Sequence, residues 1–272
     1  MKSSRAKSKA VVLTGAASGL GRALAYEFYK KGYNLALVDI DEVALQVVKH
    51  ELLSTDQIVS IHLADISREQ EVIECHDDIK RIHPNIDMLI NNAGISISQL
   101  FEIVEMDDFR NLFETNFWGT VYCTRYFLPE LKIQDDSRLV NIISGFALMG
   151  FPGKTAYGSS KSAIMGFTNA LKTELAGTSA KVSMVIPPPL DTGLVSNGKH
   201  MDSIKKDKEA VFIKKNSLPI AAVANTIVRR IEKGQFRIVV GTKTFWIDFL
   251  TRLFPTRVHA ILGQNKDKID FI

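Results

Sequence analysis

Runs of consecutive apolar residues alternate with amphipathic stretches along almost the whole chain, and this alternation constrains the fold most strongly. Near-continuous apolar runs are typical of strands buried on both faces, as in parallel sheets whose strands are joined by helices. We expect strands at 10–15, 34–39, 57–65, 86–94, 138–145, 181–187 and 236–241, and helices at 20–32, 41–53, 67–82, 107–132, 155–176 and 224–234. The pattern predicts an α/β fold: a doubly wound parallel sheet of about seven strands with helices on both faces.

The composition is that of an ordinary globular protein, with 46% apolar and 24% charged residues over 272 positions. No repeat or Pro/Ser-rich linker divides the chain, so we expect one domain over 10–241. A basic, disordered arm at 1–9 precedes it, and an aromatic-rich extension at 242–272 follows it. The net charge of +4 is modest and lies largely in the arm. This distribution argues against a nucleic-acid partner.

The longest uncharged run, 139–153, is shorter than the roughly 20 residues that span a bilayer, so we expect no transmembrane segment. Behind the basic arm lies only a five-residue apolar run, too short for a signal peptide. Cys75 and Cys123 have no motif spacing and suit a reducing compartment, which predicts a cytoplasmic protein. The six histidines are scattered without ligand spacing, so we expect no metal site.

The segment TGAASGLG joins the first expected strand to the first expected helix and contains Gly15, Gly19 and Gly21. Glycines there permit a tight turn and let backbone N–H groups approach a phosphate at the positive end of the helix dipole. An acidic residue, Asp39, ends the second expected strand. A glycine-rich turn in this position, followed by such an acid, is typical of a Rossmann-type dinucleotide-binding fold.

Asp39 also indicates which nucleotide is preferred. Its carboxylate can accept hydrogen bonds from both ribose hydroxyls of adenosine, and it would repel a 2′-phosphate. Neither Ser18 nor Ile40 supplies a cation for that phosphate, and Asp41 adds negative charge. NAD(H) is therefore favoured over NADP(H). An alternative is that Asp39 merely caps the following helix.

A tyrosine and a lysine four residues apart occur twice, as Tyr157 and Lys161 in YGSSK and as Tyr26 and Lys30 in YEFYK. On a helix both pairs lie on one face, so spacing alone does not separate them. YGSSK follows a strand that ends in Ser144, at the sheet edge where such folds bind ligands. We therefore interpret YGSSK as the proton-transfer pair and YEFYK as structural.

With TGAASGLG and YGSSK in place, residues 8–241 resemble the short-chain dehydrogenase/reductase family in its single-domain form. Further matches, in the order of the family, are Asp65 with Ile66, NNAG at 91–94, Asn116 and Ser144. The resemblance implies an enzyme that interconverts an alcohol and a ketone or aldehyde by hydride transfer with NAD(P)(H). The cofactor site that it implies comprises Gly15, Ser18, Gly19, Leu20, Gly21, Asp39, Asp65, Ile66, Asn92, Ala93, Gly94, Tyr157, Lys161, Pro187, Leu190 and Thr192.

The resemblance also implies roles for a catalytic set of Asn116, Ser144, Tyr157 and Lys161. Tyr157 would be the general base in oxidation and the general acid in reduction. Because a free phenol has a pKa of about 10, we expect the Lys161 ammonium to lower the pKa of Tyr157, and to bind the nicotinamide ribose. Ser144 would hydrogen-bond the substrate oxygen, and Asn116 would hold a water that links Lys161 to solvent.

One position departs from the pattern of the family. After the sixth strand the family usually has Pro-Gly and then a threonine, whereas this chain has PPPLDT. Pro187 and Thr192 match, but Pro188 replaces the glycine. Proline has a fixed φ and no N–H, so the nicotinamide end of the site could differ from that of other members.

Phe146, Met149 and Phe151 follow Ser144 and, with Ser144 and Tyr157, would line the substrate site. They suggest an apolar alcohol or ketone, and a steroid, a retinoid, a fatty-acid derivative or a small secondary alcohol all remain open. The lysine-rich segment 193–217 would form a lid by its position in the family. Its lysines suit a solvated face better than attraction of an acidic substrate.

The segment 244–263 carries six large apolar residues among cations. It could pack on its own domain, form a subunit interface or lie on a membrane surface, and Pro255 should split it into two short helices. By resemblance we expect a homodimer or homotetramer. Two alternatives to the NAD-dependent enzyme are an NADPH-dependent carbonyl reductase and a non-catalytic nucleotide-sensing or scaffold protein.

Overall fold

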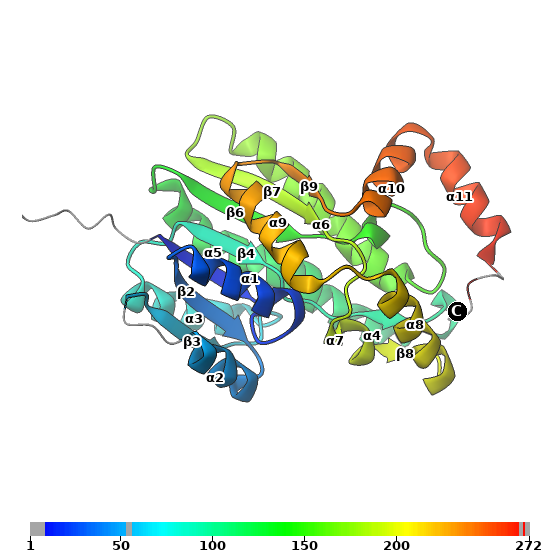
Figure 1. Ribbon diagram of the computed structural model, residues 1–272, viewed down its shortest axis with the longest axis horizontal. Coiled ribbons are helices and arrows are strands. Elements are labelled where there is room, and N and C mark those ends of the chain that lie inside the picture. The colour runs from blue at the N-terminus through cyan, green and yellow to red at the C-terminus, as the bar shows by residue number, and fades with distance from the viewer. Residues whose placement is uncertain (1–8, 53–55, 267–268, 270–272) are drawn as a thin grey trace, which may run out of the picture.

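The structure is a computed structural model and describes residues 9–52, 56–266 and 269, so the expected arm at 1–9 lies outside it except for Lys9. A seven-stranded parallel sheet, in the order β3-β2-β1-β4-β6-β7-β9, runs through the centre (Figure 1). Its strands are β1 (Ala10–Thr14), β2 (Asn34–Asp39), β3 (Val59–Leu63), β4 (Met88–Asn91), β6 (Ser137–Ile142), β7 (Ala180–Ile186) and β9 (Arg237–Val239). The predicted doubly wound α/β fold is confirmed.

Helices cover both faces of the sheet, because alternate residues of each strand point to opposite sides. On β1, Val11 and Leu13 pack into a core shared with one set of helices, whereas Val12 packs into a second core on the other face. The first face is covered by α1 (Gly19–Lys30), α2 (Glu42–Glu51) and α9 (Ile220–Glu232), and the second by α3 (Glu69–Ile82), α5 (Gly119–Lys132) and α6 (Thr155–Glu174). The sheet is therefore buried on both sides.

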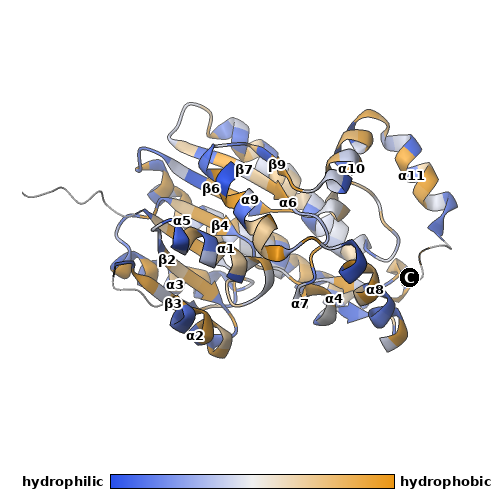
Figure 2. Ribbon diagram, viewed as in Figure 1, coloured by the Kyte–Doolittle hydropathy of each residue, from blue (hydrophilic) through white to orange (hydrophobic). Residues whose placement is uncertain are grey.

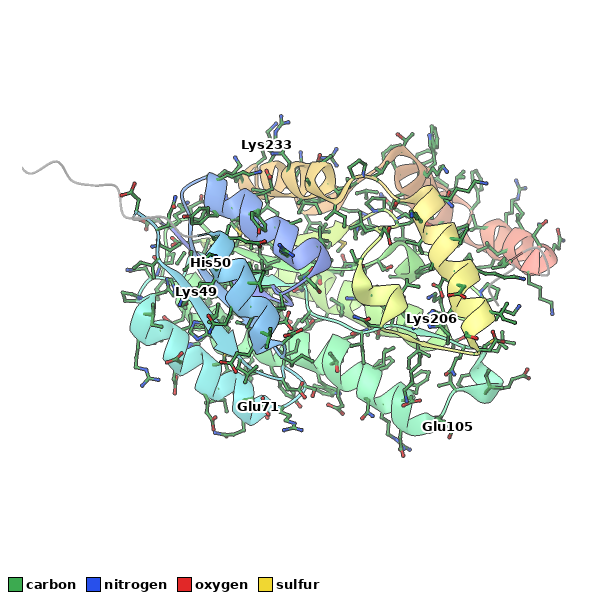
Figure 3. All side chains as sticks on the ribbon, turned by 60° about the horizontal axis from the view of Figure 1, so that its bottom comes forward. Lys49, His50, Glu71, Glu105, Lys206 and Lys233 are labelled. Carbon is green, nitrogen blue, oxygen red and sulfur yellow. The ribbon has the colours of Figure 1, made fainter. Side chains whose placement is uncertain are left out.

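The outward sides of these helices carry charged side chains. Lys49 and His50 project from α2, and Glu71 projects from the neighbouring α3 (Figure 3). Apolar residues gather instead on the strands and on the inner sides of the helices (Figure 2). This is the amphipathic pattern from which the helices were predicted.

The long helix expected at 107–132 is interrupted by one wider turn. It comprises α4 (Met106–Phe113), a π-helical turn η2 (Glu114–Trp118) and then α5, with Pro129 inside its last turns. A π-turn contains one residue more than an α-helical turn and is often found at functional sites. Asn116 is at the centre of this turn.

The order of the strands places several loops at one edge of the sheet. The chain runs from β1 outward through β2 to β3 and then returns to β4 on the other side of β1. This reversal creates a crevice between the carboxyl ends of β1 and β4, the usual ligand site of such sheets. The loops after β1, β2, β4, β6 and β7 carry the glycine loop, Asp39, NNAG, Ser144 and Pro187 to this edge.

Short elements in the loops after β4, β6 and β7 were not predicted from sequence periodicity. A small second sheet pairs β5 (Ile97–Ser98), which follows β4, with β8 (Lys199–His200), which lies between α7 (Gly193–Ser196) and α8 (Ser203–Asn216) in the chain. Two short 3₁₀ turns, η1 (Phe101–Ile103) and η3 (Gly145–Ala147), lie in the loops. Two-residue strands are too short to show a periodicity of two, which explains why β5 and β8 were not predicted.

The C-terminal segment forms α10 (Thr242–Leu253) and α11 (Pro255–Gln264). Pro255 is the first residue of α11, which confirms the predicted split into two helices. Both helices stand at one end of the sheet, away from α2 and α3, and α10 contacts β9 and η3 (Figure 1). Over the described residues, none of the helices combines the length and apolar character that a bilayer crossing requires.

Candidate active site

The glycine loop makes the closest backbone approaches of the site. Gly15 and Gly19 have positive φ values of 64° and 52°. A Cβ on Gly21 would lie 1.9 Å from the Gly15 carbonyl oxygen, and one on Gly15 would lie 2.7 Å from the Ala93 Cα atom. Only glycine fits at these positions, because any side chain would push the loop after β1 away from the loop after β4.

The first turn of α1 is free of anionic side-chain caps. Ser18 is the N-cap residue, but its hydroxyl makes no capping hydrogen bond, and no acidic residue occupies the first turn. By contrast, Asp41 caps α2 and accepts a hydrogen bond from the Ala44 N–H at 2.9 Å. The N–H groups of α1, Leu20 included, are thus left to an external anion. This arrangement fits the pyrophosphate of a dinucleotide.

Asp39 lies beside the glycine loop and is held by backbone donors. Its Oδ2 accepts from the Ala17 N–H at 2.9 Å, and its Oδ1 accepts from the N–H groups of Ile40 and Asp41 at 2.8 and 3.2 Å. The alternative that Asp39 caps α2 is wrong, because the cap is Asp41. The carboxylate is therefore fixed at the end of β2.

Asp65 and Ile66 follow β3 as expected. Asp65 Oδ1 accepts from the N–H and hydroxyl of Ser67, whereas the Asp65 N–H is already bound by Glu71 Oε2 at 2.8 Å. The Ile66 side chain is buried against Gly119 at the start of α5. Sequence reasoning did not identify Glu71, which fixes this turn.

The NNAG segment is fastened to the glycine loop. Asn92 donates from its amide nitrogen to the carbonyls of Thr14 and Gly15, both at 3.0 Å, and the Ala93 N–H donates to Thr14 Oγ1 at 3.1 Å. Gly94 faces the catalytic set, since a Cβ there would lie 2.9 Å from Asn116 Oδ1. Thr14 is a contact that the glycine pattern alone did not reveal.

Asn116 is completely buried and spans the gap between the loop after β4 and α6. Its Oδ1 accepts from the Ile95 N–H at 2.8 Å, and its Nδ2 donates to the Ile95 carbonyl and to Ser160 Oγ, both at 3.0 Å. The wider π-helical turn aims Asn116 inward. The side chain therefore holds the NNAG loop against the helix that carries Tyr157 and Lys161.

Tyr157, Lys161 and Ser144 meet at the carboxyl end of β6. Lys161 Nζ donates to the Ile142 carbonyl at 3.1 Å and lies 6.0 Å from the centre of the Tyr157 ring. Ser144 is the N-cap residue of η3 and accepts from the Phe146 N–H. All three side chains are buried. The structure thus brings together the four residues of the predicted catalytic set.

The expected lowering of the Tyr157 pKa does not occur in the protein alone. Burial raises the pKa of Tyr157 to about 12. A hydrogen bond with Ser144 acts in the opposite direction and lowers the pKa, whereas the charge of Glu209 raises it further. Burial also lowers the pKa of Lys161 to about 8. Desolvation thus sets the direction of both shifts, because burial disfavours the charged form of each group.

The second tyrosine–lysine pair makes structural contacts within α1 and with α2. Tyr26 packs against the apolar core and its hydroxyl donates to Glu51 at the end of α2, while Lys30 Nζ pairs with the buried Glu27 at 2.9 Å. These contacts support the structural interpretation of YEFYK.

Aromatic side chains lie beside Tyr157. The Phe146 ring is 6.2 Å from the Tyr157 ring and 5.1 Å from the Phe151 ring, measured between centroids. Met149 is half-buried on the same loop. The expected apolar wall beside Tyr157 is thus present for Phe146 and Phe151.

A buried ionic cluster, Lys154–Glu209–His200, joins the segment after β7 to the catalytic helix. Lys154, at the start of α6, places Nζ 2.5 Å from Glu209 Oε1 on α8 and also donates to Ser98 Oγ. His200 Nε2 lies 3.2 Å from Glu209 Oε2, and all three side chains are nearly inaccessible. Sequence reasoning missed this cluster because Glu209 stands among lysines in a helix that was interpreted as solvated.

A buried polar chain crosses the sheet beneath the site. Asn91 Nδ2 donates to Thr124 Oγ1 and to Asn141 Oδ1, and Asn141 Nδ2 donates to Thr168 Oγ1 at 2.9 Å. It ties α5, β4, β6 and α6 together. An asparagine inside the apolar run LVNII is the signal that could have identified it.

Pro188 is buried in the loop after β7. All residues with positive φ in the described chain are glycines, and Pro188 packs against Gly241. Thr192 lies against Gly19 and accepts from the Leu194 N–H as the N-cap of α7. Pro187 and Leu190 are half-buried in the same loop. The loop therefore reaches the glycine loop despite the proline.

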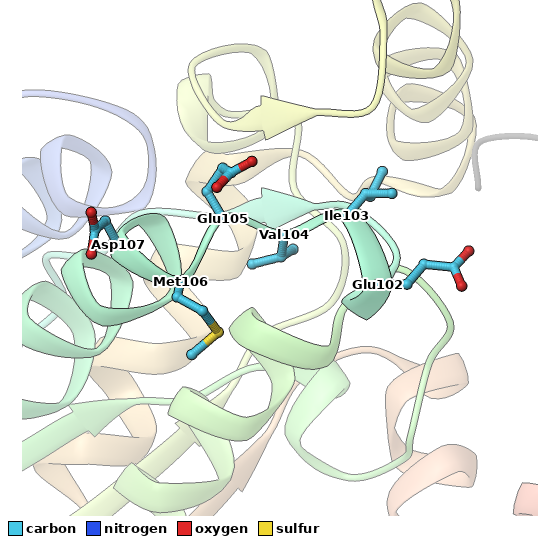
Figure 4. A pocket seen from close by; sticks show the side chains of 6 residues that line it. All are labelled: Glu102, Ile103, Val104, Glu105, Met106 and Asp107. Atoms are coloured by element: carbon cyan, nitrogen blue, oxygen red, sulfur yellow. The ribbon is translucent and has the colours of Figure 1, made fainter.

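A surface hollow of about 330 Å³ lies near this end of the sheet. It is lined by consecutive residues of one segment: Glu102, Ile103, Val104, Glu105, Met106 and Asp107 (Figure 4). Only Val104 joins the apolar cluster around Tyr157. Because the hollow contains none of the four catalytic candidates, we do not assign a substrate to it.

Among the described residues, no group of three or more His, Cys, Asp or Glu side chains is arranged to hold a metal ion.

Comparison with known proteins shows which family has this fold and site. Residues 9–203 match the family described as short chain dehydrogenase. The Mycobacterium tuberculosis protein SadH, named as an oxidoreductase, is 33% identical over 96% of both chains. The 11-beta-hydroxysteroid dehydrogenase A of Sesamum indicum and the 3-dehydrosphinganine reductase of Danio rerio are each 32% identical, over 92% and 89% of this chain and 73% and 74% of theirs.

Solved structures share the same architecture. A short-chain dehydrogenase/reductase from Burkholderia phymatum in complex with NAD superposes with a TM-score of 0.84, at 25% identity over 91% of this chain and 94% of that one. An alcohol dehydrogenase from Thermococcus sibiricus complexed with 5-hydroxy-NADP has a TM-score of 0.75, at 22% identity over 86% of this chain and 96% of that one.

These matches agree with three features of the chain: the seven-stranded sheet, the glycine loop and the buried Asn–Ser–Tyr–Lys set. Members of the family bind NAD or NADP, which the glycine loop and the free start of α1 fit. The chain therefore belongs to the short-chain dehydrogenase/reductase family and is an oxidoreductase that acts on CH–OH groups with a nicotinamide cofactor.

Proposed function

We propose that this protein interconverts an apolar secondary alcohol and the corresponding ketone, with NAD(H) as the favoured cofactor and Tyr157 as the general acid/base. The observation that carries the proposal is the convergence of Asn116, Ser144, Tyr157 and Lys161 in one buried site at the carboxyl edge of the sheet. A protein that only sensed a nucleotide would need no such proton-transfer set.

Tyr157 and Ser144 have different roles in proton transfer. With a pKa of about 12, Tyr157 is protonated at neutral pH and is ready to donate its proton to a carbonyl oxygen. Ser144 can hydrogen-bond the same oxygen and stabilise charge that develops on it. When bound, the nicotinamide supplies or accepts the hydride. Cationic charge near the phenol favours phenolate, which Tyr157 needs in the oxidation direction.

Lys161 and Asn116 complete the proton path. Lys161 is held against the Ile142 carbonyl, where its ammonium can bind the nicotinamide ribose. Asn116 is committed to Ile95 and Ser160 through its amide group. We propose that Asn116 positions α6, the helix that carries Tyr157 and Lys161. We also propose that Asn116 and the groups around it hold the water that connects Lys161 to solvent.

The preference for NAD(H) rests on Asp39. Its carboxylate is fixed by three backbone N–H groups at the end of β2, beside the glycine loop. Ser18 and Ile40 offer no cation there, and the nearby Arg22 is engaged with Glu51 at 2.6 Å. A 2′-phosphate would meet a fixed negative charge. An NADPH-dependent reductase is the alternative, and its mark would be equal or tighter binding of NADPH.

The apolar substrate class rests on the wall of Phe146 and Phe151 beside Tyr157. Two relatives are named for a hydroxysteroid and for 3-dehydrosphinganine, which are large and mostly apolar. The segment 193–217 is the proposed lid, because Glu209 on α8 ties it to the start of α6. We further propose one domain over 10–241, a homodimer or homotetramer, and a cytoplasmic location, which the buried free thiols of Cys75 and Cys123 support.

Replacing Tyr157 by Phe tests the proposed function. Removing the phenolic proton should lower kcat by about 10²- to 10⁴-fold while NADH binding, followed by nucleotide fluorescence, changes little. Tyr26→Phe is the matched control, because it alters the tyrosine of the other pair and should leave turnover unchanged. Turnover by Tyr157→Phe at the wild-type rate would contradict the mechanism. Wild-type protein that binds NADH but turns over no apolar alcohol or ketone would favour the scaffold function.

A further inference from the structure

Helix α10 presents its apolar side to solvent and its polar side to the protein. Its buried residues are Thr244, Asp248 and Thr251, spaced four and three apart. The opposite side exposes Phe245 at 52%, Trp246 at 53% and Leu253 at 54%, together with Phe249 and Leu250. A helix that packed on its own domain would have the reverse arrangement. The domain therefore buries the polar side of α10 and leaves its aromatic side uncovered.

An ion pair fixes this orientation. Asp248 is 5% exposed and accepts from Arg237 on β9, with Arg237 Nε 3.2 Å from both carboxylate oxygens. Thr251 Oγ1 donates back to the Ile247 carbonyl at 2.8 Å, which satisfies the hydroxyl inside the contact. Rotation of α10 to bury its aromatic side would break this pair and leave a charge unpaired. The apolar side is thus held outward.

The exposed side forms one aromatic and cationic surface, which we call the α10–α11 face: Phe245, Trp246, Phe249, Leu250, Leu253, Phe254, Ile261, Lys243, Arg252 and Arg257. Its rings contact one another, with Trp246 and Phe249 5.7 Å apart between centroids. Asp248 is the sole acid between 242 and 264, and it is buried. Figure 2 shows apolar residues along both helices where they stand clear of the sheet.

We propose that the α10–α11 face binds the surface of an anionic lipid bilayer. Aromatic and aliphatic side chains flanked by Lys and Arg are the composition of helices that lie in a membrane interface. Lipid phosphates supply the negative charge that the face lacks. Lys243 donates to Asn216 at the end of α8, so Lys214 and Lys215 extend the cationic rim.

A second copy of the chain fits this face less well. A two-fold contact would bring the same cationic patch of both copies into one interface. Arg252 Nη1 lies 3.7 Å from Asp248 Oδ2 of its own helix, but neither described helix carries an exposed acid to neutralise Arg257 or Lys243 of the other copy. Opposite charges favour a surface of phosphates over a surface of guanidinium groups. Charge complementarity therefore selects the bilayer.

The face also lies next to the substrate side of the site. α10 packs beside η3, which contains Phe146, and His259 on α11 accepts from the Gly150 N–H at 3.1 Å. Docking through α10 and α11 would place the loop 145–153 close to the lipid. If the proposed function holds, an apolar substrate could then enter from the bilayer without crossing water. Membrane binding itself does not depend on that function.

Trp246 offers a direct test, because the chain contains only Trp118 and Trp246. In a Trp118→Phe background the fluorescence reports Trp246 alone. We expect a blue shift with phosphatidylcholine vesicles that contain phosphatidylglycerol, little shift with pure phosphatidylcholine, and quenching by brominated acyl chains. The protein should float with the anionic vesicles in a density gradient. No shift and no flotation with anionic vesicles would overturn the proposal.

Variants locate the contact. Phe249→Ser with Leu250→Ser, and separately Arg252→Glu with Arg257→Glu, should each weaken vesicle binding by about tenfold or more. Ile133→Ser is the control, since Ile133 is an exposed apolar residue at the end of α5, outside the face. NADH binding should be the same in all variants. A wild-type oligomer that dissociates on Phe249→Ser with Leu250→Ser, without vesicle binding by either protein, would assign the face to a second copy instead.

Discussion

The two ends of the active site are held together by different kinds of interaction. At the nucleotide end, backbone groups meet backbone groups: Gly21 lies against the Gly15 carbonyl, and Asn92 ties the loops after β1 and β4 together. At the substrate end, the Lys154–Glu209–His200 cluster connects segments more than 40 residues apart through buried charges. The nucleotide end depends on glycines, which have no side chain, whereas the substrate end depends on the pairing of charged side chains.

The comparison explains why one end is recognisable in a sequence and the other is not. Close backbone approach requires glycine at fixed spacing, so it leaves a local pattern. A buried ion pair can be formed by any acid and base that the fold brings together, so it leaves none. The ends should accordingly fail separately when they are mutated.

The largest effect on nucleotide binding is expected from Gly21→Ala. A methyl group there would be 1.9 Å from the Gly15 carbonyl oxygen, so the loop must move. Forced repacking of about 3 kcal/mol corresponds to a roughly 100-fold weaker Kd for NADH, measured by fluorescence titration. Gly166→Ala on α6 is the matched control, because its Cβ would meet no atom within 4 Å. It should leave Kd unchanged and could stabilise the helix by up to about 1 kcal/mol. Unchanged NADH affinity in Gly21→Ala would contradict the role of the loop.

Glu209→Gln should damage the substrate end instead. Loss of the carboxylate leaves Lys154 buried without its counter-charge, which typically lowers the free energy of unfolding by about 3–5 kcal/mol. Urea denaturation measures this change, and KM for the carbonyl substrate should rise while Kd for NADH stays constant. Asp207→Asn, an exposed acid on the same helix, is the control.

A double change distinguishes charge from packing at this site. Lys154→Met with Glu209→Leu removes both charges and should recover most of the lost stability, because no buried charge is left unpaired. If the double variant were as unstable as Glu209→Gln, shape rather than charge pairing would hold the segment 193–217.

Acid should affect a third region, at the outer edge of the sheet. Ser60 Oγ lies 2.7 and 2.9 Å from the Nε2 atoms of His62 and His83, and His62 Nδ1 lies 2.8 Å from Asp78. Burial lowers the pKa of His83 from 6.5 to about 4. Between these values the unfolded chain binds the proton and the folded chain does not, so stability is lost as the pH falls from 6.5 towards 4.

At pH 5 this loss should amount to roughly 2 kcal/mol relative to pH 7.5. Urea midpoints at the two pH values measure it, and His83→Gln should flatten the dependence. His76, which is on the same α3 helix and pairs with the exposed Asp77, provides the control as His76→Gln. An unchanged pH dependence in His83→Gln would assign the acid loss to other groups.

The smallest effect is expected from Asp39→Asn. Removal of the fixed charge at the end of β2 should improve NADPH binding relative to NADH by about tenfold, or roughly 1.4 kcal/mol. Asp202→Ala is the control. It removes the cap of α8, where Asp202 accepts from the Lys205 N–H, and should cost about 1 kcal/mol of stability without changing nucleotide preference. An unchanged preference in Asp39→Asn would mean that Asp39 does not read the ribose.

The sequence predicted the sheet, the glycine loop and the catalytic set because each has a local or periodic pattern. It did not predict the orientation of α10, since apolar spacing alone turns Phe245 and Trp246 inward. Arg237 on the preceding strand β9 offers Asp248 a partner, and this ion pair determines which side of α10 faces the protein. Likewise, Tyr157 is buried by residues distant in the sequence, among them Ile97 and Leu112, so its raised pKa could not be predicted from a four-residue spacing.

The π-helical turn at Glu114–Trp118 can be regarded as a single inserted residue that the chain has kept. Removing one residue from it would restore a continuous α-helix and rotate α4 against α5 by about 100°. Asn116 would then face away from Ile95 and Ser160, although every hydrogen bond of a regular helix would be present. The site therefore depends on a local irregularity in chain length, and a one-residue deletion there would be more harmful to catalysis than to folding.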